Sequence, residues 1–210
     1  MAEHPILFNG EMVRAILDGR KAQTRRVMKP QPTICRPSGS RDPTFVWYPK
    51  DDGILRNMVE TIERCPYGQP GDVLAVKETW RPRGPWAGRN IVQYRADSTE
   101  RSVIVPPGHV VIVDAREPWK SSATMPRWAS RITLGVLAVR VERVQEISEE
   151  SAKAEGCDNH CPCHNCPTPP LARFAFREVW DSINAKRGYG WESNPWVWVV
   201  EFKRQKPEGD

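Results

Sequence analysis

The segment Trp196–Val200, near the end of the chain, is a run of five apolar residues, Trp-Val-Trp-Val-Val. Aromatic and β-branched residues favour extended backbone, and a run without a polar position presents no face to water. The segment therefore predicts a central strand that is buried on both of its faces.

A second apolar segment changes its parity along the chain. Apolar residues alternate on one face over 132–136 and on the other over 137–141. Because a side-chain period of two can be shifted only by an extra residue, the change predicts a bulge near Gly135 in one long bent strand. Bent strands of this kind are typical of β-barrels.

Shorter elements lie before and between these strands. We expect a strand at 5–8, a helix capped by Asn9 and ended by Gly19, and a strand at 73–76 after the Gly71-Asp72 turn. A further strand is expected at 91–95, a short helix from Ser148 to Gly156, and a second helix over 171–183. Residues 20–26 are expected on the loop that leaves the first helix.

The chain length indicates one domain, 1–210. A chain of 210 residues with 39% hydrophobic residues supports one core, while its 20 Pro and 14 Gly predict many turns. Two variable insertions are expected, at about 29–64 and 156–170, and the first is expected to contain a hairpin around residues 45–48.

The charge balance favours a polyanionic partner. The chain has 31 Lys+Arg against 26 Asp+Glu and a pI near 9.0, and Arg20, Lys21, Arg25 and Arg26 cluster together. No apolar run approaches the roughly 20 residues that span a bilayer, and the first residues do not follow a signal-peptide pattern. We therefore expect a cytoplasmic protein without membrane contact, in which cysteines are reduced or bind metal.

Residues 19–26 contain the pattern G-x-K-x-x-T-x-R. Together with the first strand, the Gly71-Asp72 turn that leads to Glu78, and the Trp-rich final strand, this pattern resembles the ASCH domains of the PUA-like superfamily. More narrowly, the whole chain resembles the ASCH-like proteins of phages and prophages. The resemblance covers most of the chain outside the two insertions.

The resemblance implies an α+β fold, a PUA-like mixed β-barrel of five or six strands flanked by helices. It also implies a cleft for RNA or a nucleoside beside the first helix. One bacterial member is an amidohydrolase that deacetylates N4-acetylcytidine through a Lys, a Thr and a Glu. The positions of this sequence that match them are Lys21, Thr24 and Glu78, and this chemistry needs no cofactor.

These residue types can perform acyl transfer. A Thr hydroxyl needs a base to become a nucleophile, and a neutral lysine amine can be that base. Neighbouring cations and burial would both favour the neutral amine of Lys21. A simpler interpretation is also open. Lys21, Arg25 and Arg26 would then form an exposed basic loop, Thr24 would cap the next turn, and Glu78 would pair with an arginine across the sheet.

Other side chains are candidates for ligand binding. Trp80 and Trp128 could stack on a base, or they could be packed in the core, as most tryptophans are. Basic side chains could contact phosphates; these are Arg20, Arg25, Arg26, Arg127 and Arg131.

The second insertion gathers thiols and imidazoles. Cys157, Cys161, Cys163 and Cys166 could hold a structural zinc ion, with His160 or His164 as substitutes. Only Cys163 and Cys166 have the C-x-x-C spacing, so a thiol-rich loop without metal is the alternative.

Three classes of function remain open on the sequence alone. The first is an amidohydrolase acting on a modified cytidine, and the second is a reader of RNA or modified bases that performs no reaction. The third is a phage accessory protein acting through protein contacts. The sequence does not indicate an oligomeric state.

Overall fold

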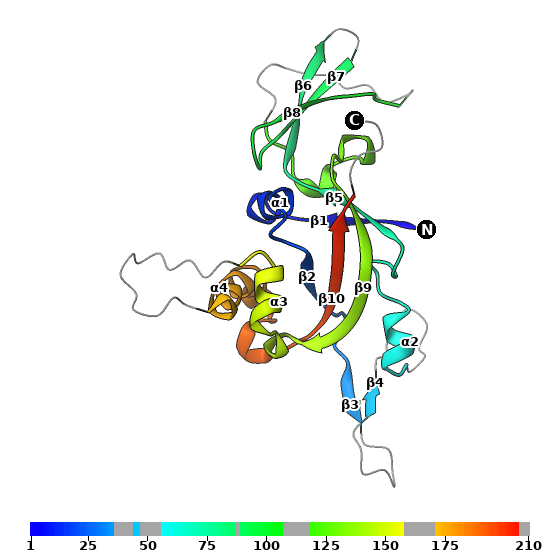
Figure 1. The fold of residues 1–210 in the computed structure, drawn as a ribbon, viewed down its shortest axis with the longest axis vertical. Helices are drawn as coiled ribbons and strands as arrows, with labels where there is room; N and C mark the ends of the chain where they lie inside the picture. Colours follow the sequence, from blue (N-terminus) through cyan, green and yellow to red (C-terminus); the bar gives the residue numbers. More distant parts are fainter. Residues whose placement is uncertain (36–43, 47–55, 87–88, 107–117, 158–170, 206–210) are drawn as a thin grey trace, which may run out of the picture.

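The computed structural model describes residues 1–35, 44–46, 56–86, 89–106, 118–157 and 171–205. In this part of the chain a five-stranded sheet, a three-stranded sheet and a small hairpin are combined with four α-helices (Figure 1). The predicted α+β class is confirmed.

The main sheet is mixed. Its strands lie in the order β1 (Glu3–Leu7), β5 (Val73–Lys77), β9 (Thr133–Arg143), β10 (Trp196–Arg204) and β2 (Gln23–Val27). Strands β1 and β5 are parallel, and the other neighbours are antiparallel. Among the described strands no ladder joins the edges β1 and β2. A side chain links them instead: Arg26 Nη2 donates to the Leu7 carbonyl at 2.6 Å.

Strand β10 is buried on both faces, as its apolar run predicts. One face contributes to the cluster formed with α1 (Gly10–Leu17), and the residues concerned are Trp196, Trp198, Val200 and Phe202. The other face, with Val197 and Val199, packs against α4 (Ala172–Asn184). Because β10 lies between β9 and β2, it is the centre of the core.

Strand β9 contains the predicted irregularity, displaced by two residues. The β9–β10 register shifts where Glu201 pairs with Ala138 and Phe202 with Val136, which makes Leu137 the extra residue. Gly135 itself is paired, with Lys203. Leu137 is 58% exposed, so the bulge lets an apolar residue of the wrong parity face outward.

The helices begin where the sequence predicts them. The Asn9 side chain caps α1 by accepting from the Met12 amide at 2.9 Å, and Ser148 caps α3 (Glu149–Ala154) by accepting from Ser151 at 3.1 Å. Helices α3 and α4 contact each other, and α2 (Met58–Ile62) contacts β9. Figure 1 shows α1, α3 and α4 on one side of the main sheet and α2 on the other.

The three-stranded sheet is the main feature that the sequence did not predict. It consists of β6 (Trp80–Trp86), β7 (Arg89–Tyr94) and β8 (Glu100–Val103), and only the strand at 91–95 was expected. Pro82, Gly84 and Pro85 obscure the alternation along β6, and its register shifts between Pro82 and Gly84. This sheet has its own hydrophobic cluster and lies beyond α1 at the top of Figure 1.

The first insertion contains the predicted hairpin. Strand β3 (Thr33–Cys35) pairs with β4 (Thr44–Val46) in antiparallel register. None of the helices in the described segments combines the length and the apolarity that a membrane crossing needs.

Candidate functional site

A cleft of about 1320 Å³ opens beside the first helix. Its walls are contributed by α1, β2, the end of α3, and α4 with the Tyr189 segment that follows it. Small-molecule sites are usually several hundred Å³, so this cleft has room for a nucleoside with adjoining groups. Lys21 and Thr24 both line it, whereas Glu78 does not.

Lys21 lies at the floor of the cleft. Its ammonium Nζ donates to Glu155 Oε2 at 2.6 Å and to the Glu155 carbonyl at 2.8 Å. Only 1% of the Lys21 side chain and 5% of the Glu155 side chain are exposed. Burial lowers the pKa of Lys21, because a low-dielectric environment disfavours the charged amine, and the carboxylate of Glu155 opposes this effect.

Glu155 is the acidic residue of the site that the sequence analysis missed. It is the C-cap of α3, and the backbones of Lys21 and Glu155 form an isolated antiparallel bridge. The neighbouring Ala22 amide donates to the Ala154 carbonyl at 2.8 Å. The end of α3 is therefore fastened to the chain just before β2.

Gly156 makes this close approach feasible. Its φ is +87°, a left-handed conformation that favours glycine, and an added Cβ would lie 3.0 Å from Ala15 Cβ and 3.2 Å from Lys21 Cβ. A signal for Glu155 was present in the sequence, since a glycine that ends a capped helix fixes the preceding residue. The sequence does not show, however, that the segment after α1 lies beside Glu155 in the fold.

Thr24 lies on strand β2 rather than on a loop. Residues 23–27 form the edge strand beside β10, where Thr24 pairs with Val200, so the expected loop for 20–26 is wrong over this stretch. The polar segment forms a strand because it pairs with apolar residues of β10. The sequence of residues 23–27 alone does not indicate this pairing. Thr24 is 2% exposed and lines the cleft.

The basic residues of the cluster differ in their surroundings. Arg20 pairs with Asp18 at 3.0 Å at the end of α1. Arg25 is buried and pairs with Glu142 and Glu155. Arg26 lies over the Phe8 ring at 5.0 Å, and burial lowers its pKa. All three line the cleft, as the sequence analysis expected of ligand-binding residues, but only Arg26 forms no ion pair with a described residue.

The cleft as a whole is strongly cationic. Among the described residues, eight basic side chains line it: Arg14, Arg20, Lys21, Arg25, Arg26, Lys29, Arg64 and Arg187. Three acidic residues of the same described segments do so: Glu11, Asp18 and Glu155. Aromatic surface lies beside this charge, and Lys29 Nζ is 5.4 Å from the Tyr189 ring. A cationic cleft with aromatic walls suits a planar ligand that carries negative charge.

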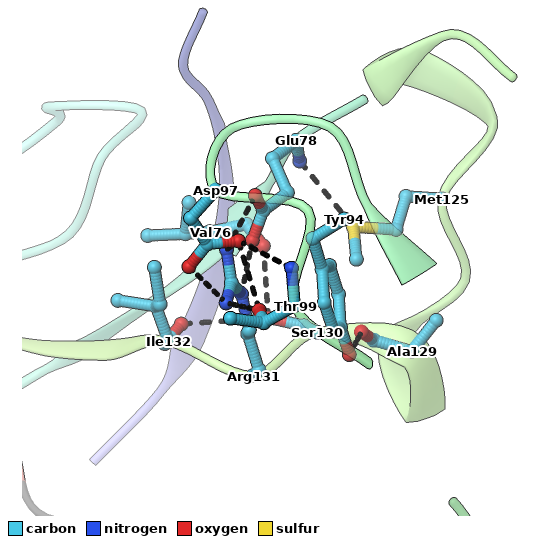
Figure 2. Close-up of polar contacts among 10 residues, drawn as sticks. All are labelled: Val76, Glu78, Tyr94, Asp97, Thr99, Met125, Ala129, Ser130, Arg131 and Ile132. Atoms are coloured by element: carbon cyan, nitrogen blue, oxygen red, sulfur yellow. Dashed lines mark hydrogen bonds and ion pairs between the residues drawn. The ribbon is translucent and has the colours of Figure 1, made fainter. Parts of the chain in front are cut away.

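The structure places Glu78 in a different cluster, which Figure 2 shows around Arg131. Arg131 binds the Glu78 carboxylate through Nε at 2.8 Å and Nη2 at 3.0 Å, and it binds Asp97 through Nη1 at 2.8 Å. Its guanidinium also lies 4.1 Å from the Tyr94 ring. Glu78 therefore pairs with an arginine across the sheet, as the simpler interpretation proposed. It follows β5, the second strand of the sheet order, whereas Lys21 precedes the edge strand β2.

The Glu78 cluster joins the two sheets. Arg131 precedes β9 of the main sheet, while Asp97 and Thr99 lie between β7 and β8 of the small sheet. Burial raises the pKa of Glu78 although Arg131 opposes the shift. Burial on its own would lower the pKa of Arg131, but the hydrogen bonds that Arg131 donates to Glu78 and Asp97 prevail and raise this pKa. This arrangement is a structural clasp, and we call Glu78, Asp97, Thr99 and Arg131 the clasp below.

The remaining ligand-binding candidates lie outside the cleft. Trp80 is buried and meets Trp128 edge to face, with ring centroids 5.9 Å apart, in the core of the small sheet. Arg127 Nε pairs with Glu3 at 2.6 Å, and Arg131 belongs to the clasp. None of these four residues lines the cleft, so the structure does not bring them together with Lys21.

The proposed zinc ligands fall largely outside the described residues. Cys161, Cys163, Cys166, His160 and His164 all lie there, and only Cys157 is described. Cys157 is buried and lines the cleft two residues after Glu155. Within the described segments no group of three or more His, Cys, Asp or Glu side chains could hold a metal ion. The structural zinc therefore stays a prediction.

Comparison with known proteins gives one structural likeness. No family model and no curated protein matches the chain. The crystal structure of an ASCH domain from Lactobacillus crispatus JV V101 aligns with 97% of this chain and 79% of its own, at 11% identity and a TM-score of 0.41. That protein belongs by its name to the family whose motif residues 19–26 resemble. A TM-score of this size is too low to support a conclusion about this chain.

Proposed function

We propose that this protein hydrolyses an acyl amide on a modified nucleobase of the N4-acetylcytidine type, bound in the cationic cleft. The observation that carries the proposal is the buried pair of Lys21 and Glu155, 2.6 Å apart at the floor of that cleft. Thr24 lines the same cleft as this lysine and its carboxylate partner. Glu155 takes the part that the family resemblance suggested for Glu78.

The reaction begins with the activation of Thr24. The neutral amine of Lys21 takes the proton of the Thr24 hydroxyl, whose oxygen attacks the acyl carbonyl and forms a C–O bond. The C–N bond then breaks, and the exocyclic amine leaves with the proton returned by the Lys21 ammonium. Water hydrolyses the acyl-threonine, releases the carboxylic acid and restores the hydroxyl.

Lys21 has the environment that such a base requires. Burial lowers its pKa, so a larger fraction of the amine is neutral at a given pH than in a free lysine. Glu155 opposes this effect while it holds Nζ in place. These opposing effects act on a group that has to alternate between amine and ammonium in the proposed reaction.

The walls of the cleft support a nucleoside or RNA as the ligand. Four cationic side chains that line it form no ion pair with any described residue; these are Arg14, Arg26, Lys29 and Arg187. They leave positive charge available to a phosphate or to an electron-rich base. The half-buried ring of Tyr189 also lines the cleft and offers surface on which a base can stack.

The test is the release of acetate from N4-acetylcytidine. Wild-type protein should release it, and Lys21→Met, Thr24→Ala and Glu155→Gln should each lower kcat/KM by at least ~10²-fold. Lys77→Met is the matched control, because Lys77 lies outside the cleft and donates to the Ala123 carbonyl. Turnover by Thr24→Ala at the wild-type rate would remove the covalent mechanism. No turnover by wild-type protein would remove this substrate.

A reader of RNA that performs no reaction is the second candidate, and the four unpaired cations favour it. In that case RNA should bind without hydrolysis, and affinity should fall steeply as salt rises, because phosphate contacts release counterions. Arg26→Met and Arg187→Met should each flatten the slope of log Kd against log salt by about 1. Binding that does not respond to salt would contradict this candidate.

A further inference from the structure

Arg25 lies beneath the Lys21–Glu155 pair and is held on several sides. Its Nη2 binds Glu142 Oε2 at 2.9 Å, and its Nη1 binds Glu155 Oε1 at 3.3 Å. Its guanidinium also lies 5.8 Å from the Phe176 ring. With the Gln23 amide oriented so that its oxygen faces Arg25, that oxygen accepts from Nη1 at 2.8 Å.

This arrangement makes Arg25 a fixed part of the protein interior. Only 1% of its side chain is exposed, although it forms part of the cleft floor. A guanidinium that already binds two carboxylates and a ring has little capacity left for a ligand. Its role therefore differs from that of Arg26, whose hydrogen bond to the Leu7 carbonyl leaves its charge unpaired.

The Glu155 carboxylate is divided between two cations. Oε2 accepts from Lys21 at 2.6 Å, while Oε1 accepts from Arg25 at 3.3 Å. Both bonds are buried, so each restricts the rotation of the carboxylate. Since Arg25 is in turn held by Glu142 on β9, the orientation of Glu155 is fixed by the main sheet as well as by α3.

We propose that Arg25 is a positioning residue: it holds Glu155 so that Oε2 stays on Lys21, and by sharing this carboxylate it favours the neutral amine of Lys21. The proposal rests on the role of Lys21 as a base in the proposed function. Arg25 acts only through Glu155 and does not touch the ligand.

The charges around Lys21 determine the direction in which its titration should shift when Arg25 is replaced. Glu155 at the end of α3 and the Cys157 thiol after it favour the ammonium, whereas Arg26 on β2 and burial favour the amine. Asp18 and Arg20 at the end of α1 pair with each other. Removal of the Arg25 charge would leave the Glu155 carboxylate to Lys21 alone. This change stabilises the ammonium of Lys21.

The test follows the titration of Lys21 without substrate, by NMR of ¹³C-labelled lysine side chains, with Lys21→Met to assign the signal. Arg25→Gln should raise the midpoint of the Lys21 titration by about one pH unit, and Arg25→Lys should restore part of the difference. Glu142→Gln is the matched control. It leaves Arg25 bound to Glu155 alone, so the midpoint should not rise.

Arg25→Gln takes one ion-pair partner from the buried Glu155 and one from the half-buried Glu142, and this variant can fail to fold. The double variant Arg25→Gln/Glu142→Gln removes one charge of each sign and still frees Glu155 from Arg25. It should show the raised midpoint as well. A folded single or double variant in which Lys21 titrates as in wild-type protein would overturn the proposal.

Turnover separates this inference from the proposed function. If N4-acetylcytidine is hydrolysed, the acid limb of kcat/KM in Arg25→Gln should move to higher pH together with the NMR midpoint. A purely structural role would lower kcat without moving that limb. If no turnover is found, the catalytic proposal fails, while the NMR titration still decides whether Arg25 controls Lys21.

Discussion

Lys21 and Glu155 are 134 positions apart in the sequence, but Lys21 Nζ lies 2.6 Å from Glu155 Oε2. The contact exists because the turn after α1 and the end of α3 form a backbone bridge at these same two residues. The lysine and its acidic partner are thus brought together by main-chain pairing, and their separation does not depend on flexible side chains alone.

The two glutamates of the chain that could partner a catalytic lysine should respond differently to mutation. Glu155→Gln should lower kcat/KM for N4-acetylcytidine by about 10²-fold or more, because Lys21 loses the group that orients it. Glu78→Gln should keep the activity of each folded molecule within roughly threefold of wild type, since Glu78 lies in the clasp. Steady-state kinetics on both variants checks this. The reverse order of effects would return the catalytic role to Glu78.

Activity should depend on the protonation of Lys21. Because the base works as a neutral amine and burial lowers its pKa, kcat/KM should rise with pH and level off below the pH at which a free lysine titrates. A pH–rate profile measured in constant ionic strength checks this. A rate that falls as pH rises through this range would show that the ammonium, rather than the amine, is the active form.

The clasp should contribute strongly to stability. Arg131→Met removes the partner of Glu78, whose side chain is only 2% exposed, and leaves a buried carboxylate without compensation. Loss of one partner from a buried pair costs about 3–5 kcal/mol in the free energy of unfolding. Urea unfolding measures the effect. Arg127→Met is the control, because its ion pair with Glu3 is exposed and is worth at most about 1 kcal/mol.

Tyr94 should make the protein sensitive to alkali. Burial raises its pKa from 10.0 to about 12, and its hydroxyl donates to the Ala129 carbonyl at 2.8 Å. Between these pH values the unfolded state loses the proton and the folded state keeps it, so stability is complete below pH 10 and is lost as pH rises toward 12. The loss amounts to at most about 3 kcal/mol.

The comparison with Tyr94→Phe isolates this contribution. Urea unfolding between pH 9 and pH 12 should show a shallower decline for the variant than for wild-type protein. Cys65 also titrates in this range, since burial raises its pKa to about 11, and it is present in both proteins. Parallel declines would show that Tyr94 does not titrate as the structure implies.

Features set by local sequence could be predicted. The apolar run of β10 required burial on both faces, and Asn9 and Ser148 carry caps that depend on hydrogen bonds within a few residues. The hydrophobic stripe of α1 follows from helical periodicity in the same way. In the candidate site, Lys21 and Thr24 were placed at the cleft because the motif and the end of the first helix lie next to each other in sequence.

Features set by distant contacts could not be predicted. Residues 23–27 carry polar and basic side chains that are typical of a loop, and they form a strand because they pair with β10. Glu155 was given no role, since its partner Lys21 is 134 positions away in sequence. Glu78 was assigned from the family resemblance, but it binds Arg131 and does not line the cleft. The prolines of β6 interrupt the alternating pattern of a strand, so the sequence did not predict the three-stranded sheet.

The tight approach at Gly156 has a consequence for how this protein tolerates change. The space that an ordinary side chain would fill there is already occupied by Ala15 and Lys21. A residue with no functional group of its own thereby determines how near Glu155 can come to Lys21. Any side chain added at this position would disturb the contact between these two residues, although Gly156 forms no part of their ion pair.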